Sequence, residues 1–280
     1  MSHRTSAAVA TARAVLIAAL LVVLIGCGGT VSTPPTGPPA TSSPAVESLR
    51  FTVVAQHPHD PSSFTEGLVF VDESTLAESS GQYGQSDVRL VEVMTGSIMR
   101  RSLLDPSQFA EGLALRQGTL TQLTWRERVV LRWSTTDLAS QPGATLEAEG
   151  WGLTYNPADD SFLSSDGTSR ISVRDPDTMA ERRSFVVRRD GTEIRKLNEL
   201  EFVDGQLWAN VWQTAEILRI DPTTGSVTGV LDCTLLDPQL GDPEAVLNGI
   251  AHRPGDPPNR LWVTGKRWPT LFEIDVTGSP

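Results

Sequence analysis

Two glutamates occupy the same short sequence context, and their residue type points to proton chemistry. Phe64-Thr65-Glu66-Gly67-Leu68 and Phe109-Ala110-Glu111-Gly112-Leu113 share the pattern F-x-E-G-L. Two carboxyl groups that lie close together do not both ionise easily, so one keeps a proton near neutral pH and can serve in general acid–base catalysis. Whether Glu66 and Glu111 lie close together depends on the elements that carry them.

The motif recurs in weaker form along the whole chain. Its third residue falls at Glu66, Glu111, Trp151, Asn198 and Asn248, with spacings of 40 to 50 residues. A short strand follows each copy, and five residues beyond the Leu or Phe of that strand stand Gly81, Trp125, Gly167, Trp212 and Lys266. These positions supply two carboxylates, three tryptophans, two amides and a lysine. If they converge, they form an aromatic box with a few polar groups, which is the usual form of a small-ligand site.

The repeat also predicts the fold. Units of this length, each with several short alternating strands such as residues 75–78 and 88–93, are typical of propeller blades. Five units fit between Leu49 and the C-terminus, and the last lacks one strand. Residues 49–55 form an extra alternating strand that we expect to complete the last unit and close the ring. The sequence therefore predicts an all-β, five-bladed β-propeller, in which equivalent positions point at one axis. A pair of β-sandwiches is the alternative, but it leaves the fivefold recurrence unexplained.

Each candidate residue also has a plainer interpretation. A glutamate at the start of a strand can be a solvated edge charge, and a lone lysine such as Lys266 is usually solvated. A single tryptophan such as Trp125 is often part of a core. We interpret Trp208 and Trp262 as packing between blades, because they share a strand position with small or apolar residues.

The first 48 residues predict export and a linker. Arg4 and Arg13 precede an apolar run at residues 14–25, which suits a signal-peptide core and is short for a membrane span. Leu24-Ile25-Gly26-Cys27 resembles the lipobox of bacterial lipoproteins, in which the cysteine is lipidated. We therefore expect a signal peptide at 1–27, a disordered Pro/Ser/Thr/Gly-rich tether at 28–48 and a folded catalytic domain at 49–280. A cleaved signal without lipid, or an uncleaved anchor, is the alternative.

Composition excludes several classes of partner and cofactor. The net charge of −11 argues against nucleic acid. Cys233 has no second cysteine for a disulfide once Cys27 carries lipid, so we interpret it as a buried small residue. His57 and His59 near Asp60 lack a third metal ligand at suitable spacing, and Pro58 and Pro61 favour a turn there. We predict no metal in the catalytic site.

Longer motifs around these positions resemble the plant and bacterial glutaminyl-peptide cyclotransferases. The resemblance covers residues 51–276 and includes several stretches in the same order. They are Pro58-His59-Asp60, Glu78-Ser79-Ser80-Gly81-Gln82-Tyr83-Gly84, Gly150-Trp151-Gly152-Leu153, Leu197-Asn198-Glu199-Leu200-Glu201, Ala209-Asn210-Val211-Trp212-Gln213, Leu247-Asn248-Gly249-Ile250-Ala251 and Val263-Thr264-Gly265-Lys266 followed by Trp268-Pro269, together with the two F-x-E-G-L motifs.

The resemblance implies a five-bladed propeller that is a transferase. Such enzymes convert the N-terminal glutamine of a peptide to pyroglutamate and release ammonia, without the catalytic zinc of the animal enzymes. It implies that Glu111 is the catalytic acid/base and that the substrate-binding residues are Glu66, Trp125, Trp151, Asn198, Trp212 and Lys266. Glu66 stands where some members have Gln, which leaves its role open.

The expected partners are peptides or secreted proteins with an N-terminal glutamine, and the membrane through the lipid anchor only. We expect a monomer on the extracytoplasmic face of the cell membrane or in a periplasm. No cofactor is expected for catalysis, and whether a structural Ca²⁺ ion is bound stays open. Two alternatives also stay open: a non-catalytic propeller that binds envelope proteins or peptides, and a propeller hydrolase with a central divalent ion.

Overall fold

The computed structural model describes residues 45–278, in which nearly all regular structure is β-strand. The predicted signal segment, Cys27 and nearly all of the predicted tether lie outside the described residues. Within residues 45–278 the helical structure is the short 3₁₀ helix η1 (Thr234–Leu236). No helix in this range is long and apolar enough to cross a membrane. The described chain is an all-β protein.

Three four-stranded antiparallel sheets follow one another along the chain, with sequential strands as hydrogen-bonded neighbours. The first contains β2 (Thr65–Phe70), β3 (Thr75–Ser80), β4 (Asp87–Glu92) and β5 (Ser97–Leu103). The second contains β6 (Ala110–Arg116), β7 (Thr119–Thr124), β8 (Val129–Ser134) and β9 (Ser140–Thr145). The third contains β10 (Leu153–Asn156), β11 (Ser161–Ser165), β12 (Arg170–Arg174) and β13 (Glu181–Val186).

The fourth and last units are joined into one eight-stranded sheet, in the order β16-β17-β18-β19-β1-β22-β21-β20. The fourth unit consists of β16 (Leu197–Val203), β17 (Gln206–Val211), β18 (Glu216–Ile220) and β19 (Val227–Asp232). The last consists of β20 (Leu247–Ala251), β21 (Arg260–Gly265) and β22 (Thr270–Thr277), with β1 (Glu47–Pro58) beside β22. A small hairpin of β14 (Arg188–Arg189) and β15 (Thr192–Glu193) precedes the fourth unit.

The strand β1 makes both connections of this large sheet. Its residues 47–49 pair in parallel with residues 229–231 of β19, and its residues 50–58 pair antiparallel with β22. The strand is longer than the expected 49–55 and contains His57 and Pro58, which the sequence analysis assigned to a turn. The turn comes later, at Pro61 and Ser62.

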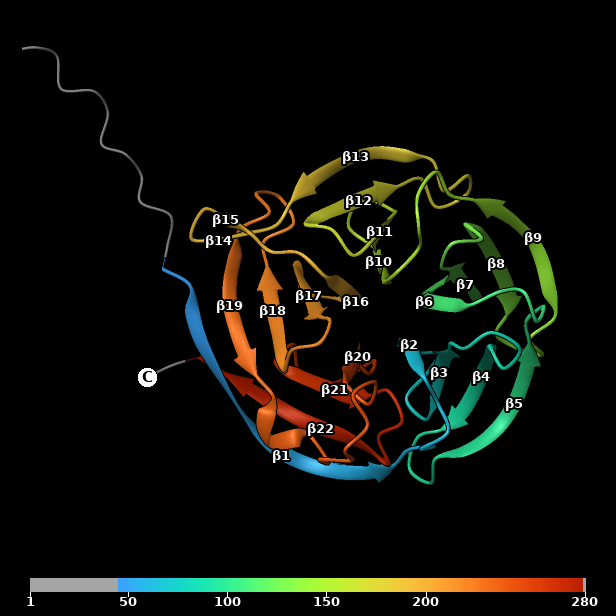
Figure 1. The fold of residues 1–280 in the computed structure, drawn as a ribbon, viewed down its shortest axis with the longest axis horizontal. Helices are drawn as coiled ribbons and strands as arrows, with labels where there is room; N and C mark the ends of the chain where they lie inside the picture. Colours follow the sequence, from blue (N-terminus) through green and yellow to red (C-terminus); the bar gives the residue numbers. More distant parts are fainter. Residues whose placement is uncertain (1–44, 279–280) are drawn as a thin grey trace, which may run out of the picture. The chain divides into compact units, whose positions relative to one another are not determined.

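The sheets stand around a common centre (Figure 1). The strands β2, β6, β10, β16 and β20 are innermost, whereas β5, β9, β13, β19 and β1 lie outside. The inner strands contact one another in a closed circuit: β2 with β6, β6 with β10, β10 with β16, β16 with β20, and β20 with β2. The first residues of all five inner strands therefore meet at one end of the circuit.

The glycine of the motif has a packing reason. A Cβ atom on Gly67 would overlap the backbone nitrogen of Leu113 in the next inner strand, and one on Gly112 would overlap the backbone of Trp151 and Leu153. Glycine thus permits the close approach of successive inner strands. Apolar clusters fill the space between neighbouring sheets; for example, Leu68 of the first sheet packs in the same cluster as Trp262 of the last.

Candidate active site

The repeat positions occupy one end of the circuit of inner strands. Glu66, Glu111, Asn198 and Asn248 lie in the first two residues of β2, β6, β16 and β20, and Trp151 lies two residues before β10. Trp125, Trp212 and Lys266 follow directly after β7, β17 and β21. Because these second strands run antiparallel to the inner ones, their ends lie beside the beginnings of the inner strands. We call this end of the circuit the mouth.

Glu66 is buried and forms an ion pair across the join between the first and last sheets. Its Oε1 lies 2.6 Å from Lys266 Nζ, and its Oε2 accepts a hydrogen bond from Asn248 Nδ2 at 3.2 Å. All three side chains are almost fully buried. Burial raises the pKa of Glu66, although the charge and hydrogen bond of Lys266 act in the opposite direction. The structure therefore brings Glu66 and Lys266, 200 residues apart in the chain, into direct contact.

Glu111 is a second buried carboxyl group within electrostatic reach of this pair. It is 5% exposed. Burial raises the pKa of Glu111 well above its ordinary range, and the charge of Glu66 raises it further, while Lys266 lowers it. The nearby carboxylates of Glu149 and Glu127 add smaller contributions in the same direction as Glu66. A carboxyl group in this environment holds its proton at higher pH than a solvated glutamate does.

Aromatic rings surround the mouth. Glu149 links two of them, because its Oε2 accepts hydrogen bonds from Trp125 Nε1 at 2.9 Å and Trp151 Nε1 at 3.3 Å. Trp151 and Trp212 meet edge to face with ring centroids 5.6 Å apart. Phe109 packs in the same manner against Trp125, also at 5.6 Å. All three tryptophans are partly exposed, so each can offer an indole face to a ligand.

Unpaired polar atoms lie on β16, β17 and β20. Four buried side-chain atoms have no hydrogen-bond partner among the described residues: Asn198 Oδ1, Asn248 Oδ1, Glu199 Oε1 and Asn210 Nδ2. A buried polar group without a partner is costly unless a ligand or water satisfies it. Asn198 and Asn248 stand at the motif position, so two of these unpaired oxygens belong to residues of the mouth.

Comparisons with known proteins identify the family of this chain. Residues 22–276 match the model of a family described as glutamine cyclotransferase. The chain belongs to the glutamine cyclotransferase family. It is 39% identical over 229 residues to a glutaminyl-peptide cyclotransferase of Arabidopsis thaliana, covering 80% of this chain and 70% of that protein. The crystal structure of Myxococcus xanthus glutaminyl cyclase matches with a TM-score of 0.77 and 34% identity, covering 84% of this chain and all of that one.

The structure corrects one interpretation of Glu66, Glu111 and Lys266. The sequence left open that Glu66 and Glu111 are solvated edge charges, and it favoured solvation for a lone Lys266. All three are at most 5% exposed, so the solvated interpretation is wrong. The mouth buries two acids and one base where strands from different sheets begin and end.

Three further carboxylates belong to the site or lie beneath it, and the repeat in the sequence does not mark them. Glu149 joins Trp125 to Trp151, as described above. Glu199 and Glu201 lie on the inner strand β16; Glu199 accepts a hydrogen bond from the backbone N–H of Ile250, and Glu201 from that of His252. Residues 198–201 read N-E-L-E, so Glu199 and Glu201 alternate with Leu200 and lie on one face of β16. Two acids in a strand that is buried on both faces are the signal that could have identified them.

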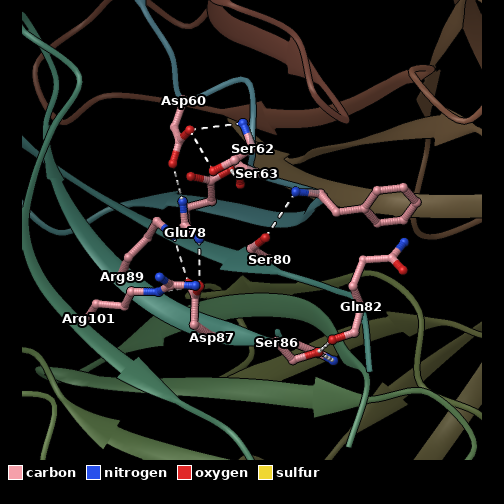
Figure 2. Close-up of polar contacts among 12 residues, drawn as sticks. Asp60, Ser62, Ser63, Glu78, Ser80, Gln82, Ser86, Asp87, Arg89 and Arg101 are labelled. Atoms are coloured by element: carbon pink, nitrogen blue, oxygen red, sulfur yellow. Dashed lines mark hydrogen bonds and ion pairs between the residues drawn. The ribbon is translucent and has the colours of Figure 1, made fainter. Parts of the chain in front are cut away.

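A polar network next to the mouth fixes the loop that carries Lys266. His59 Nδ1 lies 2.6 Å from the carbonyl oxygen of Trp268, and its Nε2 lies 3.1 Å from Glu78 Oε1. Figure 2 shows Glu78 beside Ser63 and, below it, Arg89 between Asp60 and Asp87. The Arg89 guanidinium lies 2.9 Å from Asp60 Oδ2 and 2.5 Å from Asp87 Oδ2.

The remaining titratable candidates have structural roles. Cys233 is buried, and burial raises the pKa of its thiol to about 12, so it stays protonated and unreactive. Within residues 45–278, no group of three or more His, Cys, Asp and Glu side chains is arranged to hold a metal ion.

Proposed function

We propose that this protein converts the N-terminal glutamine of peptides and secreted proteins to pyroglutamate, with release of ammonia, and that Glu111 carries the proton. The observation behind this proposal is the environment of Glu111: a buried carboxyl group with a raised pKa, facing a partly exposed aromatic mouth. Family membership supports the reaction type.

The chemistry requires one proton to move between two nitrogen atoms. The α-amino nitrogen attacks the carbon of its own side-chain amide and must lose a proton, while the departing amide nitrogen must gain one to leave as ammonia. The new C–N bond closes the five-membered ring as the old C–N bond breaks. In the proposed mechanism Glu111 accepts the first proton and donates the second. Transfer of this kind contributes about 10²- to 10⁴-fold.

The other residues of the mouth hold the glutamine in its cyclising conformation. Trp125, Trp151 and Trp212 offer indole faces that keep the side chain folded back on its own amine, and such positioning can contribute more than the proton transfer. In this proposal Asn198 Oδ1, which has no partner among the described residues, accepts a substrate N–H. Lys266, held by Glu66, supplies positive potential to the oxyanion that forms on the amide oxygen.

We infer further that catalysis is independent of metal and that the enzyme is an acyltransferase of the aminoacyltransferase class. The resemblance to the plant and bacterial branch supports both points. Full activity after dialysis against a strong chelator is the expected result. Loss of activity that Zn²⁺ or another divalent ion restores would contradict metal independence and favour a metal-dependent reaction.

We also propose that the five units are the blades of a five-bladed β-propeller that β1 closes. The closed circuit of inner strands and the antiparallel pairing of β1 with β22 support this assignment. The proposed mature protein is a monomer on the extracytoplasmic face of a membrane, held by a lipid on Cys27. The lipobox-like Leu24-Ile25-Gly26-Cys27 supports the anchor, and a Cys27→Ser variant that is released from membranes is the expected result.

Ammonia release from a Gln-initiated dipeptide by the purified protein tests the proposed activity. We expect the Glu111→Gln variant, which keeps the shape of the side chain but cannot exchange the proton, to lose at least about a hundredfold in kcat. Its circular dichroism spectrum and thermal unfolding should match those of the parent. No ammonia from either protein would instead favour a non-catalytic binding protein, and equal rates would remove Glu111 from the mechanism.

A further inference from the structure

A cavity of about 450 Å³ opens beside the mouth and is not used by the proposed reaction. It lies between the loop after β17, the segment between β19 and β20, and the loop after β21. Its wall includes Gln213, Asp237, Leu240, Asp242 and Trp268. A volume of this size holds one or two amino-acid side chains.

The wall of this cavity is continuous with the glutamine site. Gln213 directly follows Trp212, and Leu247, another wall residue, directly precedes Asn248. The backbone N–H of Lys266 donates to the carbonyl oxygen of Val246 at 2.9 Å. Trp268 Nε1 donates to the carbonyl oxygen of Ala245 at 3.0 Å. The cavity therefore begins where the fourth and last units border the mouth.

Its position suits the part of a peptide that follows the glutamine. Glu111 and Trp125 come from the second unit, whereas the cavity is lined by Gln213, which follows Trp212 of the fourth unit, and by Trp268 of the last unit. Figure 1 shows β7 and β17 on opposite sides of the common centre. A glutamine whose amine and side-chain amide face Glu111 directs its carbonyl end away from Glu111, toward the side where the cavity opens.

The lining combines apolar surface with carboxylate charge. Leu240 is 48% exposed, and Pro243 and Ala215 line the cavity with it. Asp242 is paired with Arg267, and Lys196 reaches the cavity's edge through a 2.8 Å hydrogen bond to Gln213. Asp237 has no Lys, Arg or His ion-pair partner among residues 45–278; its Oδ1 accepts a backbone hydrogen bond from Gln239. The cavity thus offers an apolar wall and one carboxylate without a countercharge.

From these observations we propose that the cavity is a subsite for a basic side chain in one of the two residues that follow the substrate's glutamine. The aliphatic stem of lysine or arginine packs on Leu240 and Ala215, and its cationic end reaches Asp237. The assignment rests on the proposed cyclotransferase function, because it describes the same substrate beyond its first residue. It makes Asp237 a specificity-determining residue rather than a catalytic one.

Peptides of one length with one varied position test the subsite. With the purified protein, kcat/KM is measured for Gln-Ala-Ala, Gln-Lys-Ala and Gln-Ala-Lys. It is also measured for the analogues of the two lysine peptides in which norleucine or glutamate replaces lysine. We expect a lysine peptide to exceed its norleucine analogue by about three- to fivefold, the size of a partly exposed ion pair. The glutamate analogue should be slowest, and 0.5 M NaCl should reduce the lysine preference.

Two variants assign the preference to this cavity. Asp237→Asn keeps the acceptor for the Gln239 N–H and should remove the preference for lysine over norleucine, with no change for Gln-Ala-Ala. Leu240→Lys, at an exposed position, should reverse the order of the lysine and glutamate peptides. Asp190→Asn removes an exposed carboxylate in the β14–β15 turn, outside the cavity, and should change nothing.

The outcomes separate the subsite from the reaction. If Gln-Ala-Ala releases no ammonia, the proposed function fails. If Gln-Ala-Ala is cyclised but the lysine, norleucine and glutamate peptides react at equal rates, the subsite is overturned while the function stands. A lysine preference that Asp237→Asn and Leu240→Lys both leave intact also overturns it, because the recognition then lies elsewhere.

Discussion

At the scale of single residues, the balance of charge around Glu111 sets the pH range in which it can act. Burial and the neighbouring Glu66 carboxylate both raise the pKa of Glu111, while Lys266 lowers it. Lys266 is itself bound to Glu66 at 2.6 Å. Glu66 therefore acts on Glu111 twice, through its own charge and by neutralising the lysine.

Replacing Glu66 with Gln should shift the pH profile. The variant loses a negative charge near Glu111 and leaves Lys266 without its counterion, and both changes lower the pKa of Glu111. Because Glu111 accepts a proton only when ionised, kcat/KM should begin to rise at a pH about one unit lower than in the parent. Rates for one dipeptide from pH 5 to 9 measure this, and the substrate amine titrates alike in both proteins. An unchanged profile would show that Glu66 does not influence the shuttle.

Glu149 should matter through the tryptophans rather than through the proton. Its Oε2 holds the indole N–H groups of both Trp125 and Trp151. Glu149→Ala frees both rings, so we expect KM to rise about tenfold with a smaller change in kcat, since a wall that binds the substrate has been loosened. Glu149→Gln keeps an acceptor oxygen and should recover most of the loss. If Gln and Ala behave alike, the hydrogen bonds to the indoles are not what positions the rings.

The repeat in the sequence predicted which residues share the mouth, but not that they are buried. Equivalent positions converge in any circular repeat, so Glu66 and Lys266 could be placed at one end of the fold from spacing alone. Their burial could not, because it depends on how closely neighbouring inner strands pack. Glu149 was missed for another reason. It stands two residues before Trp151, and the other copies of the motif have no glutamate at this position. Its role is visible only in the structure, where the indole N–H groups of Trp125 and Trp151 point to it.

At the scale of elements, the segment between β1 and β2 holds the loop that carries Lys266. The backbone N–H of His59 donates to the carbonyl oxygen of Pro269, and that of Arg267 donates to the carbonyl oxygen of Ser63. The His59 ring reaches both Trp268 and Glu78. Burial alone would lower the pKa of His59, but the Glu78 charge and the hydrogen bonds outweigh it and raise the pKa. The pKa of Glu78 falls to about 2, because His59, Arg89 and hydrogen bonds outweigh burial.

The costs of removing either partner of this buried pair should not add. His59→Gln removes the directly bonded cation of the buried Glu78 carboxylate, and Glu78→Gln removes the directly bonded anion of the imidazolium, so each should cost about 3 kcal/mol of unfolding free energy. The double variant should cost clearly less than the sum, as expected for residues in direct contact. Urea unfolding at pH 6 measures all four proteins. Strict additivity would mean that the two side chains do not interact.

The strands themselves were largely predictable, and the exceptions have local causes. Alternation marked the second and third strands of most units, and the F-x-E-G-L motif marked the inner strands β2 and β6. The parallel pairing of β1 with β19 was not foreseen, because residues 47–49 give no signal of a second partner beyond β22. The hairpin β14–β15 was missed as well. It is two residues long on each side, too short for periodicity to show.

At the scale of the whole folded unit, the circuit of inner strands encloses carboxyl groups far from solvent. Glu199 and Glu201 of β16 are both buried. Burial raises the pKa of Glu201 to about 8, although hydrogen bonds from His252 and Thr154 act against it. Burial also raises the pKa of Glu199 well above its ordinary range, and the Glu201 charge adds to this. The hydrogen bonds that these carboxyl groups accept from the backbone N–H groups of Ile250 and His252 tie the fourth unit to the last one.

These acids should make the fold less stable as pH rises. Glu201 binds a proton in the folded state up to about pH 8, whereas in the unfolded chain it releases the proton near pH 4.5, so raising the pH between these values favours unfolding. The free energy of unfolding should fall across this window by up to about 1.4 kcal/mol per pH unit from this one group. Glu201→Gln, which can keep the His252 hydrogen bond, should flatten the dependence measured by urea unfolding at pH 5, 6, 7 and 8. Glu73→Gln, at an exposed turn before β3, should leave it unchanged. A Glu201→Gln protein that loses stability with pH as steeply as the parent would show that Glu201 is already ionised in the folded state.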